Sequence, residues 1–166
     1  MNGEKIEGLI YDWLNDNYPE GPIWLDDDYD GSPDVPLEIK MVSAFNTIEY
    51  NISNGGWSQL LWNCLGTWRP LIQIAREGYA LIGAPEQATA LDRVQELCER
   101  DETECINTMN DTDETGDQFA EFTRRSYATK GTEWEALFWT GIYEKRIAWL
   151  EANESRIRKL IGRIDA

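Results

Sequence analysis

Apolar side chains recur every three or four residues along almost the whole chain, and the strict alternation typical of a β-strand is nearly absent. Such spacing places the apolar side chains on one face of a helix. We therefore expect an all-α fold, a single compact domain of about six or seven helices with acidic loops. The expected helices cover residues 4–17, 37–52, 57–66, 68–82, 85–98, 118–128 and 132–164.

The 166 residues suffice for one domain, and a domain of this size buries roughly 70% of the surface of its unfolded chain. A capping box at residues 132–135 predicts the start of a long final helix, in which Gly141 and Asn153 are candidate bends. Residues 1–166 then divide into an acidic N-terminal helix and loop (1–38), a helical core (39–100), an acidic loop (101–117) and C-terminal helices (118–166).

Negative charge is abundant and unevenly distributed. The chain has 31 acidic and 15 basic residues, and the charge balance is −10 over residues 1–38, zero over 39–94, −9 over 95–121 and +3 over 122–166. Direct binding to nucleic acid or to an anionic membrane needs clustered lysine and arginine, so we expect neither. An even spread of the net charge over roughly 8,400 Å² would be about five times more dilute than the charge of duplex DNA. Only clustering of the two acidic blocks could reach that density.

Several chemistries are excluded by the residue types present. The sequence has no histidine, which rules out Ser-His and Cys-His triads within this chain. Cys64, Cys98 and Cys105 lack metal-type spacing, and we expect buried thiols in a reducing cytoplasm. No secretion signal or membrane span is visible. We expect a cytoplasmic protein without a cofactor and not an enzyme, with a small carboxylate enzyme as a minor alternative.

Residues 26–34 suggest a second alternative. Asp26-Asp27-Asp28-Tyr29-Asp30-Gly31 fits the first half of a calcium loop, and Asp34 falls at its ninth position. Leu37 stands where the twelfth position needs a bidentate glutamate, and Pro33 and Pro36 oppose flanking helices. We therefore expect no metal site and interpret the segment as an acidic loop or partner surface. A calcium- or metal-tuned interaction module stays open as the alternative.

The stretch from Ile48 to Asn63 holds an acidic residue, an Asn-Gly-Gly-aromatic-x-Gln core, two large apolar residues and a final asparagine. This pattern resembles the hallmark of the DMP-type DNA-mimic protein family, and Ile82-Gly83-Ala84 further along also fits it. We interpret the motif as a glycine turn between two helices, with Gln59 and Asn63 satisfying buried backbone groups nearby. The motif residues are Asn54, Gly55, Gly56, Trp57, Gln59 and Asn63.

The resemblance implies an all-helical protein whose carboxylates imitate the phosphates of DNA. Such a protein inhibits a DNA-binding protein or nucleoprotein complex that has a basic DNA channel, by competing with DNA. The partner would be a transcription factor, a nucleoid protein or a defence nuclease complex of the restriction or CRISPR type. The final helix could also supply a homodimer interface. The acidic blocks lie outside the motif, so their charge alone selects the candidate phosphate surrogates: Asp26, Asp27, Asp28, Asp30, Asp34, Glu99, Asp101, Glu102, Glu104, Asp111, Asp113, Glu114 and Asp117.

Overall fold

The structure, a computed structural model, describes residues 2–26, 34–111, 117–127, 139 and 141–164. All regular structure in this part of the chain is helical, which confirms the expected all-α class. The elements are α1 (Gly3–Asn17), the 3-10 helix η1 (Ile23–Leu25), α2 (Leu37–Asn63), α3 (Trp68–Leu81), α4 (Pro85–Asn110), α5 (Gln118–Tyr127), α7 (Ile142–Ala152) and α8 (Glu154–Ile164).

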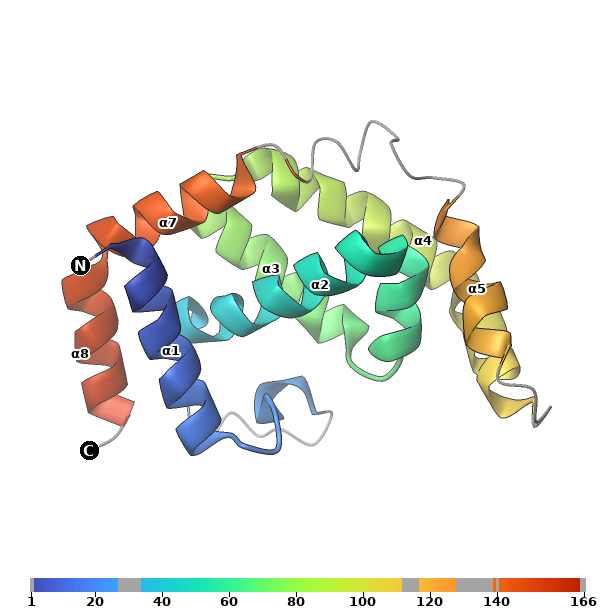
Figure 1. Ribbon diagram of the computed structural model, residues 1–166, viewed down its shortest axis with the longest axis horizontal. Coiled ribbons are helices and arrows are strands. Elements are labelled where there is room, and N and C mark those ends of the chain that lie inside the picture. Colours follow the sequence, from blue (N-terminus) through green and yellow to red (C-terminus); the bar gives the residue numbers. More distant parts are fainter. Residues whose placement is uncertain (1, 27–33, 112–116, 128–138, 140, 165–166) are drawn as a thin grey trace.

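The helices form an elongated single domain with α2 near its centre (Figure 1). α3 packs against both α2 and α4. α5 packs against the part of α2 at and after Gly56, where this helix is kinked. α1, α7 and α8 form one end of the molecule, and the second half of α4 together with α5 forms the other end. The two acidic stretches of the sequence therefore belong to different parts of the fold.

Aromatic and branched side chains on the inner helix faces build the core. Phe45 and Tyr79 stack with their ring centroids 4.2 Å apart where α3 meets α2. A Cβ atom at Gly78 would lie 2.6 Å from the Met41 Cβ, so the glycine permits the close approach of these helices. Burying one large apolar side chain contributes about 1.5–3 kcal/mol. The largest of these, each at most 1% exposed, are Trp57, Trp68, Tyr79, Phe45 and Phe122.

A buried polar cluster joins α1, α2, α3 and α7. The Arg146 guanidinium lies 2.9 Å from a Glu7 carboxylate oxygen and 2.5 Å from one of Glu49, and the Tyr79 hydroxyl donates to Glu49 at 3.1 Å. Burial raises the pKa of Glu7, although the neighbouring Arg146 charge opposes the shift. One cation thus stands between two carboxylates, and removing it would leave both without a counter-charge.

The break predicted at Asn54-Gly55-Gly56 is confirmed as a kink in α2. Gly56 has φ 72° and ψ −163°, a backbone conformation that is essentially restricted to glycine. The two segments of α2 therefore run in different directions on either side of the motif (Figure 1). The helix predicted over residues 57–66 is the second of these segments, and it ends at Asn63.

Two further predicted boundaries differ from the structure. Residues 101–110, expected as part of an acidic loop, are helical, because α4 continues to Asn110 through Asp101 and Cys105, both of which are buried. Side chains of α3 and α5 contact this extension, so tertiary contacts stabilise a helix whose apolar periodicity is weak. The long final helix is divided into α7 and α8 at Asn153, and Gly141, with φ 63°, precedes α7. The predicted capping box at residues 132–135 lies outside the described residues.

Candidate functional site

The structure places the predicted phosphate surrogates in two separate regions. Asp26 follows η1 and Asp34 precedes α2, whereas the other described candidates lie on α4, directly after it or directly before α5. Eight of the predicted residues can be described; the other five lie outside the described residues, namely Asp27, Asp28, Asp30, Asp113 and Glu114. From the second group, Glu104, Asp111 and Asp117 line one cavity between α4 and α5.

Three predicted surrogates are already neutralised by arginines of the same chain. The Asp101 carboxylate, 9% exposed, pairs with Arg100 at 2.7 Å and lies 3.9 Å from Arg125. Glu104 forms a two-pronged pair with Arg125, one of its contacts measuring 2.6 Å, which lowers the pKa of the Glu104 carboxyl group. These contacts tie α5 to α4. Such an arginine–carboxylate pair offers a partner little net charge.

Glu102 is the third of these residues and connects α4 to α3. It accepts two hydrogen bonds from Arg69, at 2.6 and 2.7 Å, and one from the Trp68 indole nitrogen at 3.0 Å. Hydrogen bonding by Arg69 is the main reason that the pKa of the Glu102 carboxyl group is lowered. Glu102 is therefore a charged structural residue. The sequence could not separate it from its exposed acidic neighbours, because Arg69 is 33 positions away.

Exposed carboxylates gather where α4 and α5 diverge. Asp111 and Asp117 are both exposed, and Glu121 follows Asp117 by one helical turn on α5. Together with Glu104 they line a cavity of about 360 Å³, and Arg125 is the one cation among its described lining residues. Glu121 is missing from the predicted set, although its spacing from Asp117 was a visible signal. This α4–α5 surface, defined by Glu104, Asp111, Asp117 and Glu121, is the first acidic region.

A second acidic region includes the last two turns of α1 and the segment after them. Asp12 and Asp16 lie one turn apart on the exposed side of α1, and Glu20 and Asp26 follow in the segment that leads through η1. Asp34 is exposed at the start of α2. None of these five carboxylates forms an ion pair with another described residue. Asp12, Asp16 and Glu20 were not predicted as site residues, because the first two belong to the solvated polar face of the predicted helix and Glu20 belongs to the segment that ends it.

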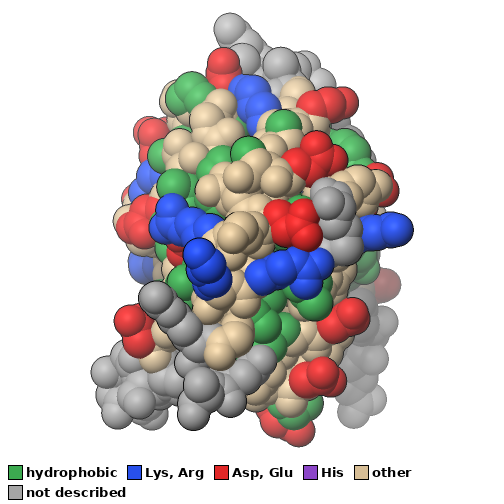
Figure 2. All heavy atoms as spheres, turned by 90° about the vertical axis from the view of Figure 1, so that its left-hand side faces the viewer, with side chains coloured by type: hydrophobic (Ala, Val, Ile, Leu, Met, Phe, Trp, Pro, Cys, Tyr) green, Lys and Arg blue, Asp and Glu red, His purple; other side chains and the backbone are tan. Residues whose placement is uncertain are grey.

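The end formed by α1, α7 and α8 has a different character. Figure 2 shows lysine and arginine side chains gathered near its middle, with acidic side chains between and around them. Two of the α8 arginines serve the fold, since Arg156 pairs with the buried Glu38 and Arg158 pairs with Glu154 at 3.0 Å. Charges of both signs thus share this end, in agreement with the positive balance of residues 122–166.

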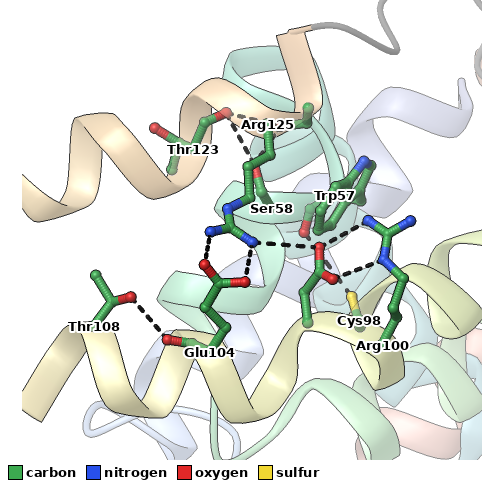
Figure 3. Close-up of polar contacts among 10 residues, drawn as sticks. Trp57, Ser58, Cys98, Arg100, Glu104, Thr108, Thr123 and Arg125 are labelled. Atoms are coloured by element: carbon green, nitrogen blue, oxygen red, sulfur yellow. Dashed lines mark hydrogen bonds and ion pairs between the residues drawn. The ribbon is translucent and has the colours of Figure 1, made fainter.

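The Asn-Gly-Gly motif forms the surface of α2 against which α5 packs. The Ser126 hydroxyl of α5 hydrogen-bonds the Gly55 carbonyl and the Ser58 hydroxyl, and Ser58 donates to the Thr123 carbonyl at 3.0 Å (Figure 3). A Cβ atom at Gly56 would lie 2.6 Å from the Ser126 Cβ. The motif glycines therefore allow α5 to pack closely against the kink. This agrees with the interpretation of the motif as a glycine turn between two helices. Sequence reasoning missed both serines, whose partners lie more than 60 residues away.

The polar motif residues differ in detail from their expected contacts. Asn63 donates to the Asn51 side chain at 2.7 Å, and Asn51 in turn donates to the Thr47 carbonyl at 2.8 Å. The expected bond from Asn63 to a buried backbone group is thus replaced by a side-chain bridge across the kink. The Gln59 side chain lies against Gly55, where a Cβ atom would come within 2.3 Å of its Oε1.

Other site chemistry can be examined in the same described residues. They contain no group of three or more histidine, cysteine, aspartate or glutamate side chains placed to hold a metal ion. Most of the calcium-like loop, residues 27–33, lies outside them. The three cysteines are unpaired and buried, and burial raises the pKa of Cys64 and of Cys105 to about 11. No helix in the described ranges has both the length and the apolar character needed to cross a membrane.

Comparison with known proteins places this fold in a family. Residues 33–153 match the family model described as DMP19-like protein, a span that runs from the start of α2 to the end of α7 and includes the kink motif. Searches of curated proteins and of solved structures each returned no match. α1 and α8 lie outside the matched span and pack against each other. Because the matched region is most of the chain, the protein belongs to the DMP19-like family.

Proposed function

We propose that this protein is a DNA mimic that presents clustered carboxylates to the DNA-binding site of a protein partner and blocks DNA binding by competition. The family takes its name from DNA mimic protein 19, which supports this function class. The observation that carries the proposal is the distribution of counter-charges. Nine described arginines and lysines pair with carboxylates of the same chain. In contrast, the five acids of the second region, and every acid of the first region except Glu104, form no ion pair with a described residue.

The spacing of these acids suits a backbone-like charge array. Carboxylates one turn apart on a helix, such as Asp12 with Asp16 or Asp117 with Glu121, are separated by about 6 Å along the axis. Phosphates of one DNA strand follow one another at about 3.4 Å along the duplex axis, so every second phosphate comes at about 6.8 Å. A basic surface built for phosphates can therefore meet both pairs without large rearrangement.

The structure changes which residues we assign to the mimic surface. Among the described candidates we retain Asp26, Asp34, Glu99, Asp111 and Asp117. Asp101, Glu102 and Glu104 are assigned to holding α4 in place, because their charge is matched by arginine. The proposed surface also includes Asp12, Asp16, Glu20 and Glu121, and the proposal still includes Asp27, Asp28, Asp30, Asp113 and Glu114, which lie outside the described residues.

We further propose that the partner is a transcription factor, a nucleoid protein or a defence nuclease complex in the cytoplasm, and that the protein acts as its inhibitor without catalysis. A partner can be isolated by immobilising the protein, loading native extract at low ionic strength and eluting with duplex DNA. Elution by DNA selects proteins whose DNA site was occupied. The purified partner is then bound to a labelled duplex and titrated with this protein. Release of the duplex at low salt, lost as the salt concentration rises, is the expected result.

Matched charge variants test the surface itself. The double variant Asp117→Asn/Glu121→Gln removes two open charges from the α4–α5 surface, while Glu77→Gln/Glu144→Gln removes two exposed charges from α3 and α7. An exposed ion pair contributes about 0.2–1 kcal/mol, so the first variant should weaken competition by about 2- to 30-fold. The second should change it little. Equal effects of both variants would mean that only net charge matters, which contradicts the proposed surface.

A further inference from the structure

A cavity of about 330 Å³ lies between the segment after α1 and the junction of α2 with α3. Leu25, Leu71 and Cys64 are buried residues of its lining, at 8%, 1% and 9% exposure. Glu20 and Asp26 are exposed acidic residues of the same lining, so acidic residues accessible to solvent border the cavity beside buried apolar residues. The volume falls in the range of about 300–1,000 Å³ that is usual for small-ligand sites.

The wall of this cavity is held in place by contacts that do not involve a ligand. Tyr18 lies between Trp13 and Trp24 in two edge-to-face contacts, with ring centroids 5.6 and 5.3 Å apart. The Leu25 and Asp26 amides donate to the Pro22 and Ile23 carbonyls, each at 3.0 Å. Aromatic pairs of this kind contribute about 0.5–1.5 kcal/mol beyond their buried area. The cavity is thus preformed, which lowers the cost of ordering a bound group.

Among the described residues, the lining combines buried apolar side chains with two acids and contains no lysine or arginine. Neither Glu20 nor Asp26 has an ion pair within the described part of the chain. An anion would be repelled at the opening, and a neutral apolar group would leave the carboxylates unused. A cation carried on an apolar stem can pair with the carboxylates while its stem contacts the apolar lining. Guanidinium fits better than ammonium, because it is planar, weakly hydrated and can bond two carboxylate oxygens at once.

We propose that this cavity receives an arginine side chain of the protein partner, with the guanidinium at Glu20 and Asp26 and the methylene stem along Leu25 and Leu71. The assignment of the arginine to a partner rests on the proposed function, whereas the chemistry of the cavity does not. In a DNA-binding partner, the same arginine would otherwise contact DNA. The mimic would then offer an anchoring pocket in addition to a distributed array of charge.

Cys64 provides a direct readout of occupancy. It lines the cavity and is 9% exposed, whereas Cys98 and Cys105 are fully buried. We would measure the rate of Cys64 alkylation by N-ethylmaleimide at mildly alkaline pH, by mass spectrometry of the Cys64 peptide. The probes are phenylguanidinium and its neutral isostere phenylurea. At twice its dissociation constant, phenylguanidinium should slow alkylation about threefold. Phenylurea at the same concentration should not slow it, and equal protection by both, or by neither, would overturn the proposal.

Charge variants and peptide probes complete the test. Glu20→Gln/Asp26→Asn should abolish the difference between the two probes, whereas the matched control Glu77→Gln/Glu144→Gln on α3 and α7 should retain it. All four residues are exposed, so both variants should fold. A blocked Gly-Arg-Gly peptide should protect Cys64 more than Gly-Lys-Gly. Protection by phenylguanidinium but not by the arginine peptide would overturn the assignment to a partner side chain. No DNA is present in this assay, so its failure is separable from failure of DNA competition.

Discussion

Replacing Gly56 by alanine should strongly destabilise this fold, for two reasons that the structure separates. The backbone conformation at φ 72° and ψ −163° is essentially restricted to glycine, and such a conformation costs another residue about 1–3 kcal/mol. The new Cβ would lie 2.6 Å from the Ser126 Cβ and 2.9 Å from its hydroxyl oxygen. Forcing a methyl group into a packed contact typically costs about 1–3 kcal/mol more. A loss of about 2–6 kcal/mol is expected from the two costs together.

Thermal and chemical unfolding followed by far-ultraviolet circular dichroism would measure this loss. For a chain of this size, about 3 kcal/mol corresponds to a decrease in Tm of about 6–12 °C. The control is Gly66→Ala, because no atom lies within 4 Å of a Cβ at Gly66 and its φ is not positive. We expect the control to stay within about 0.5 kcal/mol of the wild type.

A double-mutant cycle separates the backbone cost of Gly56→Ala from its steric cost. In a Ser126→Gly background the steric contact is absent, so Gly56→Ala should cost only its backbone part there. The coupling free energy between positions 56 and 126 then measures the steric contact between α5 and the kink. If Gly56→Ala and Gly66→Ala were equally mild, the argument that the motif glycine is required by the kink and by the seating of α5 would be refuted.

Two further predictions concern buried and paired charges. Arg146→Met should lower the free energy of unfolding by about 3 kcal/mol, since it leaves the Glu7 and Glu49 carboxylates without their counter-charge; urea denaturation at neutral pH measures it. Glu102→Gln should destabilise the protein at neutral pH. Because the folded-state pKa of Glu102 is lowered by Arg69, its contribution is present above the ordinary glutamate pKa and is lost as the pH falls through the folded-state value. The wild type and this variant should therefore converge in stability at acidic pH, and a constant difference at every pH would contradict the pairing.

The sequence predicted the helical elements well because helix formation leaves a local signal. The spacing of Ile6, Ile10 and Trp13 identified α1, and the glycine pair at residues 55 and 56 identified the kink. The extension of α4 beyond Asp101 was missed, since its stability depends on contacts with Arg69 and Arg125 from distant parts of the chain. Local periodicity cannot report such contacts.

The candidate site was less accessible to sequence reasoning. Acidic residues close in sequence have the same charge in the printed chain, yet Glu102 and Asp101 pair with arginines, whereas Asp111 and Asp117 remain exposed. The sequence by itself determined the helical class, the excess of negative charge and the position of the glycine turn, because each follows from residue type and short-range spacing. Only the tertiary structure decided which carboxylates stay open to a partner. That outcome depends on which helix faces meet, and cations far away in the chain reach an acid only after those faces have packed.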